Sequence, residues 1–142
     1  MNQNKQVMIT VHTTQTNTDG EKEKIQFQAP GNLYIKNNSI YIIYKEDKLT
    51  GMEGTTTSLR VEPQRVTLIR MGPTQLKLVF VEGTNHLATY ATPYGNMGAE
   101  VITNKVRVDL TELGGSINLE YELFLENEKI GINELLITVK EV

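Results

Sequence analysis

Turn-forming residues recur about every ten positions along this chain, a spacing typical of short antiparallel strands joined as hairpins. The pairs Asp19-Gly20, Asn37-Asn38 and Gly114-Gly115 are examples, because Asn, Asp and Gly supply the positive φ angles that tight hairpins require. Further turns are expected at Pro30-Gly31, 48–51, 72–73, 83–85, 93–95, Asn104 and Asn127.

The residues between these turns favour strands over helices. Thr, Ile and Val occur 17, 12 and 11 times, so 40 of 142 residues are β-branched, against only 4 Ala. β-branched side chains pack well on a pleated sheet and lose rotamer freedom on a helix. A helical bundle is thereby excluded, and the best helical candidate is one short turn over 47–53.

Two C-terminal segments, 105–110 and 117–125, alternate between apolar and polar residues. Successive side chains of a strand point to opposite faces, so this period of two indicates strands with one face in solvent. The residues expected inside are Val106, Val108, Leu110, Leu119, Tyr121, Leu123 and Leu125. Those expected in solvent are Lys105, Arg107, Glu120 and Glu122.

The pattern predicts an all-β protein, with residues 1–142 forming a single domain. Many antiparallel strands with short connections must hide their edges in a barrel or a sandwich. Hairpins between neighbours down the whole chain favour a closed or nearly closed up-and-down antiparallel barrel of about ten strands. The segments, some of which should fuse, lie near 5–15, 22–28, 32–36, 39–46, 55–62, 65–71, 75–82, 86–92, 97–103, 105–112, 116–126 and 132–140.

Composition excludes several classes of function. Cys is absent, which rules out thiol catalysis and thiolate metal sites. The net charge of −3 is too acidic for a typical nucleic-acid-binding protein, which carries a basic stripe. The N-terminus lacks the pattern of a signal peptide, and no apolar run is long enough to span a membrane. We therefore expect a cytoplasmic protein that binds neither nucleic acid nor membranes.

Five short motifs resemble the YwiB-like family of uncharacterised bacterial proteins in order and rough spacing. They are Arg70-Met71-Gly72, 80–83, Tyr90-Ala91-Thr92-Pro93-Tyr94-Gly95, Thr103 and Tyr121-Glu122-Leu123. The similarity covers about Val7 to Lys140. The resemblance implies a calycin-like, lipocalin-like β-barrel and a bacterial origin, but no reaction.

Arg70 is the most informative single residue. Alternation places Val66, Leu68 and Arg70 on one face, so Arg70 points into the barrel if the other two do. A buried guanidinium stays charged and needs acceptors around it. Arg70 is either a structural plug at one barrel end or an anchor for a ligand's carboxylate or phosphate. Under either interpretation we expect it to be buried and fully hydrogen-bonded.

Three tyrosines complete the candidate site. Tyr90 and Tyr121 have hydroxyl groups that need a partner when buried, which makes them natural companions for Arg70. Tyr94 lies in the Thr92-Pro93-Tyr94-Gly95 segment, which is either a plain tight turn or a loop over the barrel mouth. The predicted ligand-binding residues are Arg70, Tyr90, Tyr94 and Tyr121.

Catalytic and metal sites have little support in the sequence. His12 and His86 have no carboxylate at metal-ligand spacing beside them, and His86 is expected in an exposed turn. Ser39, Ser58 and Ser116 are not in nucleophile elbows. We therefore expect no catalytic constellation, no metal and no cofactor.

The leading functional hypothesis is a non-catalytic barrel that binds a small anionic or amphipathic ligand inside or at its mouth. The alternative is a compact interaction or structural module with a solidly filled barrel, working through its surface or its acidic C-terminal strands. A homodimer is considered for either. Cavity volume separates the two, since ligand sites measure about 300–1,000 Å³ and filled interiors leave no void much larger than a water molecule.

Overall fold

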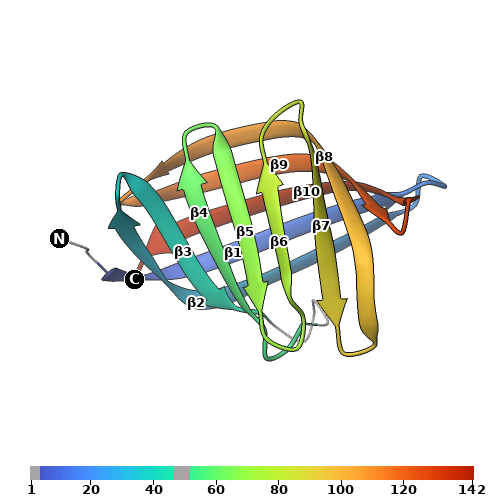
Figure 1. Ribbon diagram of the computed structural model, residues 1–142. Helices are drawn as coiled ribbons and strands as arrows, with labels where there is room; N and C mark the ends of the chain where they lie inside the picture. The colour runs from blue at the N-terminus through green and yellow to red at the C-terminus, as the bar shows by residue number, and fades with distance from the viewer. Residues whose placement is uncertain (1–3, 47–51) are drawn as a thin grey trace.

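The computed structural model describes residues 4–46 and 52–142, and every regular element among them is a β-strand. This part of the chain contains no helix that could cross a membrane. The ten strands, drawn in Figure 1, are β1 (Asn4–Asn17), β2 (Lys22–Lys36), β3 (Ser39–Lys45), β4 (Thr56–Glu62), β5 (Arg65–Met71), β6 (Leu76–Phe80), β7 (Asn85–Thr92), β8 (Gly95–Thr111), β9 (Gly114–Leu125) and β10 (Glu128–Glu141).

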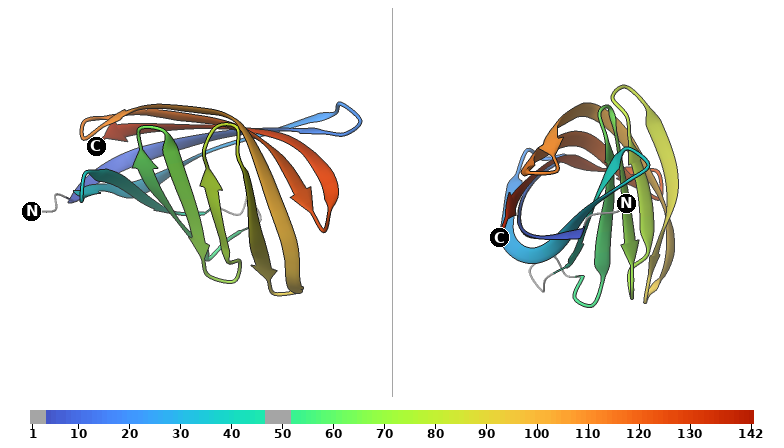
Figure 2. Two further views of the ribbon diagram at one scale, coloured as in Figure 1. Left: turned by 45° about the horizontal axis from the view of Figure 1, so that its top comes forward. Right: turned by 90° about the vertical axis from the view of Figure 1, so that its left-hand side faces the viewer.

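All ten strands form one antiparallel sheet that curls into a barrel (Figures 1 and 2). Its order is β6-β5-β4-β3-β2-β1-β10-β9-β8-β7. Strands that follow each other in the sequence are therefore paired, except β6 and β7, which form the two edges of the sheet, and the terminal strands β1 and β10 pair with each other. At one end of that seam, Gln75 and Ala91 exchange backbone hydrogen bonds of 2.8 and 2.9 Å. The prediction of a nearly closed up-and-down barrel is confirmed.

One predicted turn, Pro30-Gly31, is wrong, because β2 continues through it from Lys22 to Lys36. A Cβ atom on Gly31 would clash with Cδ1 of Ile9 and lie 2.6 Å from the carbonyl oxygen of Ile43. Glycine is thus required here for the close approach of β2 to its two neighbours. A glycine that serves packing and one that serves a turn look alike in sequence.

The turn predicted at Asn104 is also wrong, since it falls inside β8. The pairing of β8 with β9 shifts register between Thr103 and Lys105. Asn104 is therefore part of a β-bulge, in which one extra residue bends a continuous strand. These two fusions reduce the twelve predicted segments to ten strands. The turn expected at 48–51 and most of the helical turn expected over 47–53 lie outside the described residues.

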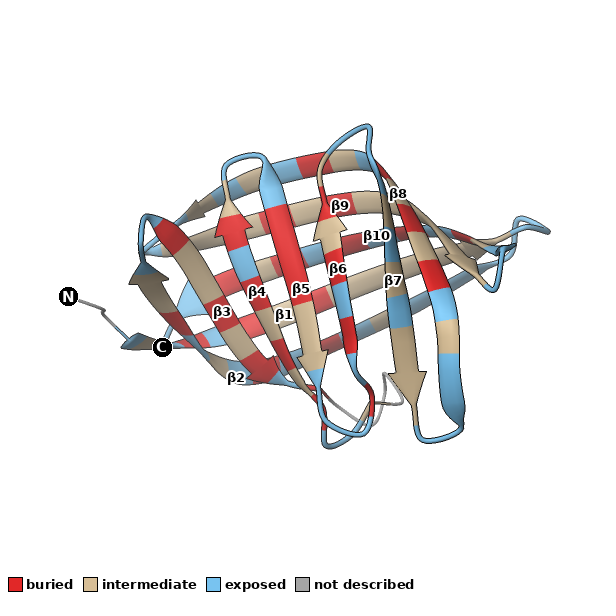
Figure 3. Cartoon of the chain, viewed as in Figure 1, coloured by how far each residue is buried: buried red, intermediate tan, exposed pale blue. Residues whose placement is uncertain are grey.

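The alternation predicted for β8 and β9 is largely confirmed, and Figure 3 shows buried positions alternating with more exposed ones along the strands. Leu119 is fully buried, and Val106, Val108, Leu110, Tyr121 and Leu123 belong to or pack against the core. Leu125 is half-buried and lies outside that cluster.

The polar face of these strands is less exposed than predicted. Arg107 is exposed, but Lys105, Glu120 and Glu122 are half-buried. Glu120 lies between Lys105 on β8 and Glu134 on β10, and Glu122 pairs with Lys129 at 3.0 Å. Neighbouring side chains on both sides shield a central strand even where its face meets solvent.

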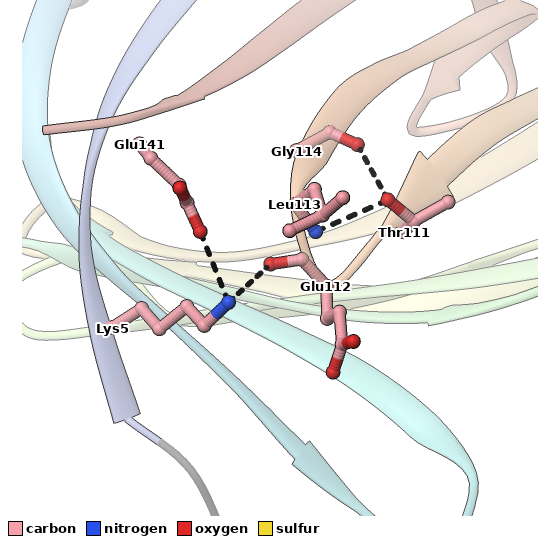
Figure 4. Close-up of polar contacts among 6 residues, drawn as sticks. All are labelled: Lys5, Thr111, Glu112, Leu113, Gly114 and Glu141. Atoms are coloured by element: carbon pink, nitrogen blue, oxygen red, sulfur yellow. Dashed lines mark hydrogen bonds and ion pairs between the residues drawn. The ribbon is translucent and has the colours of Figure 1, made fainter.

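A polar contact ties the β8–β9 turn to the two terminal strands (Figure 4). The Lys5 ammonium of β1 donates to the carbonyl oxygen of Glu112 at 3.2 Å and pairs with the Glu141 carboxylate of β10 at 3.0 Å. Within the turn, the Leu113 amide donates to the Thr111 hydroxyl at 3.1 Å. Residues from both ends of the chain are thereby joined to the β8–β9 hairpin.

Candidate functional site

The interior of the barrel contains a cavity of about 230 Å³. Nine of the ten strands contribute side chains to its lining. Every second residue of each strand in a barrel points toward the interior, so strands from all sides meet there. Most of the wall is apolar: Val11, Phe27, Leu76, Leu78 and Leu135 are all buried core residues. The polar or hydroxyl-bearing residues of this wall are Thr13, Gln15, Tyr44, Glu46, Arg70, Tyr90, Tyr121 and Asn133.

One polar cluster is built on a row of paired residues across β3, β4 and β5. Tyr44 lies opposite Thr57, and Thr57 lies opposite Arg70, so the three side chains share one face of the sheet. Glu46, just after β3, joins them: its Oε2 lies 3.7 Å from Nε of Arg70, and the Thr57 hydroxyl donates a hydrogen bond to it. The Glu46 side chain is only 1% exposed and that of Arg70 is 19% exposed. The cluster is therefore a charge-balanced pair, with Glu46 buried and Arg70 half-buried, and it has neutral hydroxyl partners.

Tyr44 is held in its neutral form by this environment. Burial raises the pKa of its hydroxyl well above the usual value, and the negative charge of Glu46 raises it further. The nearby Arg70 and the hydrogen bond with Thr57 act in the opposite direction but do not outweigh burial. Tyr44 thus remains a hydrogen-bonding phenol.

A second polar group lies on β9 and β10. Asn133 and Tyr121 are directly opposite each other, and Nδ2 of Asn133 donates to the Tyr121 hydroxyl at 3.3 Å. The Tyr121 ring packs on Phe80 with centroids 4.8 Å apart. Both Asn133 and Tyr121 line the cavity.

Two buried polar atoms on the cavity wall have no hydrogen-bond partner among the described residues. They are Nε of Arg70, a donor, and Oδ1 of Asn133, an acceptor. Buried polar groups in proteins are nearly always hydrogen-bonded, so two such atoms on one cavity are unusual.

The structure brings together three of the four predicted site residues. Arg70, Tyr90 and Tyr121 all line the cavity, but Tyr94 does not. Tyr94 is fully exposed, at 100%, on the turn between β7 and β8, where it borders an outer hollow of about 510 Å³ together with Tyr90. The Thr92-Pro93-Tyr94-Gly95 segment is thus a tight turn at the rim of the barrel.

The expectation that Arg70 is buried and fully hydrogen-bonded is wrong in both respects. The side chain points inward beside Val66 and Leu68, yet it retains some exposure. Its Nε has no hydrogen-bond partner in the described part of the chain, since 3.7 Å to Glu46 is too long for a hydrogen bond. Among the described residues the charged partner of Arg70 is Glu46, rather than the tyrosines expected to accompany it.

Sequence reasoning missed Glu46, Tyr44, Thr57 and Asn133. A period of two through β3 puts Ile42, Tyr44 and Glu46 on one face, and Asn133 falls in the inward row of β10 with Leu135. A polar residue at an inward position was the available signal. His86 was also misplaced: it lies in β7, half-buried and opposite Val101, rather than in an exposed turn. Within the described ranges, no group of three or more His, Asp or Glu side chains could hold a metal ion.

Comparison with known proteins identifies relatives over nearly the whole chain. Residues 9–137 match the family described as Domain of unknown function (DUF1934). The sequence is 28% identical over 131 residues to the uncharacterized β-barrel protein YwiB of Bacillus subtilis (strain 168), covering 92% of this chain and 91% of that protein. The crystal structure of the ywiB protein from Bacillus subtilis superposes with a TM-score of 0.85 at 23% identity, over 98% of this chain and 93% of that one. The family resemblance drawn from the five motifs is therefore confirmed.

Proposed function

The chain belongs to the DUF1934 family of β-barrel proteins, and from the cavity in its barrel we propose that it binds a small amphipathic molecule there. The observation that carries this proposal is a cavity of about 230 Å³ with apolar walls and two buried, unpartnered polar atoms. A ligand would bury apolar surface and satisfy those atoms at the same time.

The volume of the cavity limits the size of the ligand. At about 30 Å³ per water molecule, 230 Å³ corresponds to roughly seven or eight waters. It lies below the range of about 300–1,000 Å³ for sites of drug-sized ligands. An apolar cavity of about 150 Å³ binds benzene, so by proportion this one suits a molecule of about nine non-hydrogen atoms.

The same volume argues against the alternative of a solidly filled interaction module. Packed interiors contain few voids larger than one water molecule, whereas this cavity is several times larger. Its lining also concentrates the polar groups that a filled core would exclude or pair. The interior therefore favours a binding function.

A titration with benzyl alcohol tests the proposal, since this probe has an aromatic body, one hydroxyl and a suitable size. We expect shifts of backbone amide resonances confined to residues that line the cavity. Ala99 is a buried residue of the lining, so Ala99→Leu should occupy part of the space and abolish these shifts.

The matched control is Ala91→Leu, the same substitution on neighbouring β7. Ala91 is not part of the lining, and it pairs with Gln75 at the seam. The control should bind benzyl alcohol as the unchanged protein does. Equal shifts in both variants, or none in the unchanged protein, would contradict a ligand site in the barrel.

A further inference from the structure

We propose that the ligand of this cavity is uncharged and carries one hydrogen-bond acceptor and one donor, the acceptor directed to Nε of Arg70 and the donor to Oδ1 of Asn133. This inference rests on the proposed function and names the chemical class of the ligand. A small primary amide with an aromatic or short aliphatic body is the simplest molecule of that class. A carboxylate, which Arg70 alone would attract, is excluded by the surroundings of Arg70.

The charge argument begins with the partner of Arg70. Glu46 and Arg70 are the only charged side chains among the described residues that line the cavity, and they form an ion pair with each other. An anion that approached Arg70 would therefore also approach the Glu46 carboxylate, whose side chain is 1% exposed and poorly screened by water. Attraction and repulsion nearly cancel, while the anion still loses its hydration. An uncharged ligand avoids that loss.

The hydrogen-bond argument concerns the two unpartnered atoms. Nε of Arg70 is a donor without an acceptor among residues 4–46 and 52–142, because the 3.7 Å to Glu46 is beyond hydrogen-bonding distance. Oδ1 of Asn133 is an acceptor on a residue that is only 7% exposed, while Nδ2 of the same amide is used by Tyr121. A buried donor or acceptor without a partner costs free energy. A ligand that forms hydrogen bonds with both atoms therefore gains binding free energy that a purely apolar ligand does not.

Three probes that share a benzene ring separate the possibilities. Benzamide offers a donor and an acceptor without charge, benzoate offers a charge, and toluene offers neither. We expect calorimetric titration at pH 7 to show benzamide binding about tenfold or more tightly than either of the others, which is the effect of one good hydrogen bond or more.

Two substitutions test the roles of the residues. Glu46→Gln keeps the size of the side chain but releases the charge of Arg70, so benzoate should bind at least tenfold more tightly than before and overtake benzamide. Glu120→Gln, on the solvent-facing side of β9, is the matched control and should leave the order of the probes unchanged. Asn133→Leu should weaken benzamide about tenfold and leave toluene unaffected or tighter. It supplies an independent test if Glu46→Gln does not fold.

The outcomes distinguish this inference from the proposed function. If benzoate or toluene binds the unchanged protein as tightly as benzamide does, the uncharged donor–acceptor class is wrong, although the cavity remains a binding site. A Glu46→Gln variant that folds but leaves benzoate binding unchanged would overturn the charge argument. If none of the three probes binds, the proposed function itself fails and the inference fails with it.

Discussion

Replacing Arg70 by alanine should destabilise the protein far more than replacing an exposed arginine. Arg70→Ala leaves the Glu46 carboxylate, 1% exposed, without its only positively charged partner among the described residues. Breaking a buried pair in this way typically costs about 3–5 kcal/mol. The Arg70 side chain is 19% exposed and its Nε makes no hydrogen bond to Glu46, so we expect the lower end, about 3 kcal/mol.

Arg107→Ala is the matched control. Arg107 also forms an ion pair, at 2.7 Å with Glu82, but the two side chains are 64% and 50% exposed. Exposed pairs contribute about 0–1 kcal/mol. Urea unfolding followed by circular dichroism should therefore separate the two variants by about 2 kcal/mol or more. In a thermal melt, a loss of about 3 kcal/mol corresponds to a Tm lower by roughly 6–12 °C.

The double variant Arg70→Met/Glu46→Met shows whether the loss arises from an uncompensated charge. Replacing both members of a buried ion pair by apolar residues is often neutral or stabilising. We therefore expect the double variant to be more stable than Arg70→Ala. Equal losses below about 1 kcal/mol for Arg70→Ala and Arg107→Ala would refute the reasoning, as would a double variant less stable than Arg70→Ala.

Three further outcomes follow from the structure. Gly31→Ala should cost about 1–3 kcal/mol by overpacking, measured by urea unfolding, because its Cβ would collide with backbone of β3; unchanged stability would contradict the close approach. Leu119→Ala should cost about 2–5 kcal/mol in the same assay, since Leu119 is 0% exposed, while Leu113→Ala, at a site 68% exposed, should stay within about 0.5 kcal/mol. The pKa of Glu82 should lie below its usual value, because the Val106 amide and then Arg107 hydrogen-bond its carboxylate. The ionised Glu82 carboxylate therefore stabilises the folded protein at pH values above its unfolded-state pKa. This stabilisation is lost as the pH falls through the lowered pKa of the folded state. Arg107→Ala should raise this pKa partway in a ¹³C carboxyl NMR titration, and an unchanged pKa would contradict the contact with Arg107.

The strands and their faces were determined largely by the sequence alone. Alternation in β9 identified Leu119 and Tyr121 as inward residues, because a strand's period of two is a local property of consecutive residues. The Asn37-Asn38 turn was equally readable: both residues have positive φ, 51° and 66°, as a two-residue hairpin requires. Hairpins between consecutive strands then favoured an up-and-down order of the strands in the sheet.

Only the tertiary structure decided which local signals had another purpose. Gly31 and Asn104 carry the same residue types as true turns, but one permits close packing of three strands and the other is part of a bulge. Neither role can be predicted from adjacent residues in the sequence, because each depends on contacts with a neighbouring strand of the sheet.

The candidate site depended still more on tertiary structure. Arg70 could be placed on an inward face from the sequence, but its partner Glu46 lies two strands away, and Asn133 reaches the same cavity from β10. The cavity volume is what nine strands leave unfilled once the barrel has closed. The period of two determines to which face of its own strand each side chain points. Which side chains meet across strands, and how much space remains between them, depends on the register and curvature of the whole sheet.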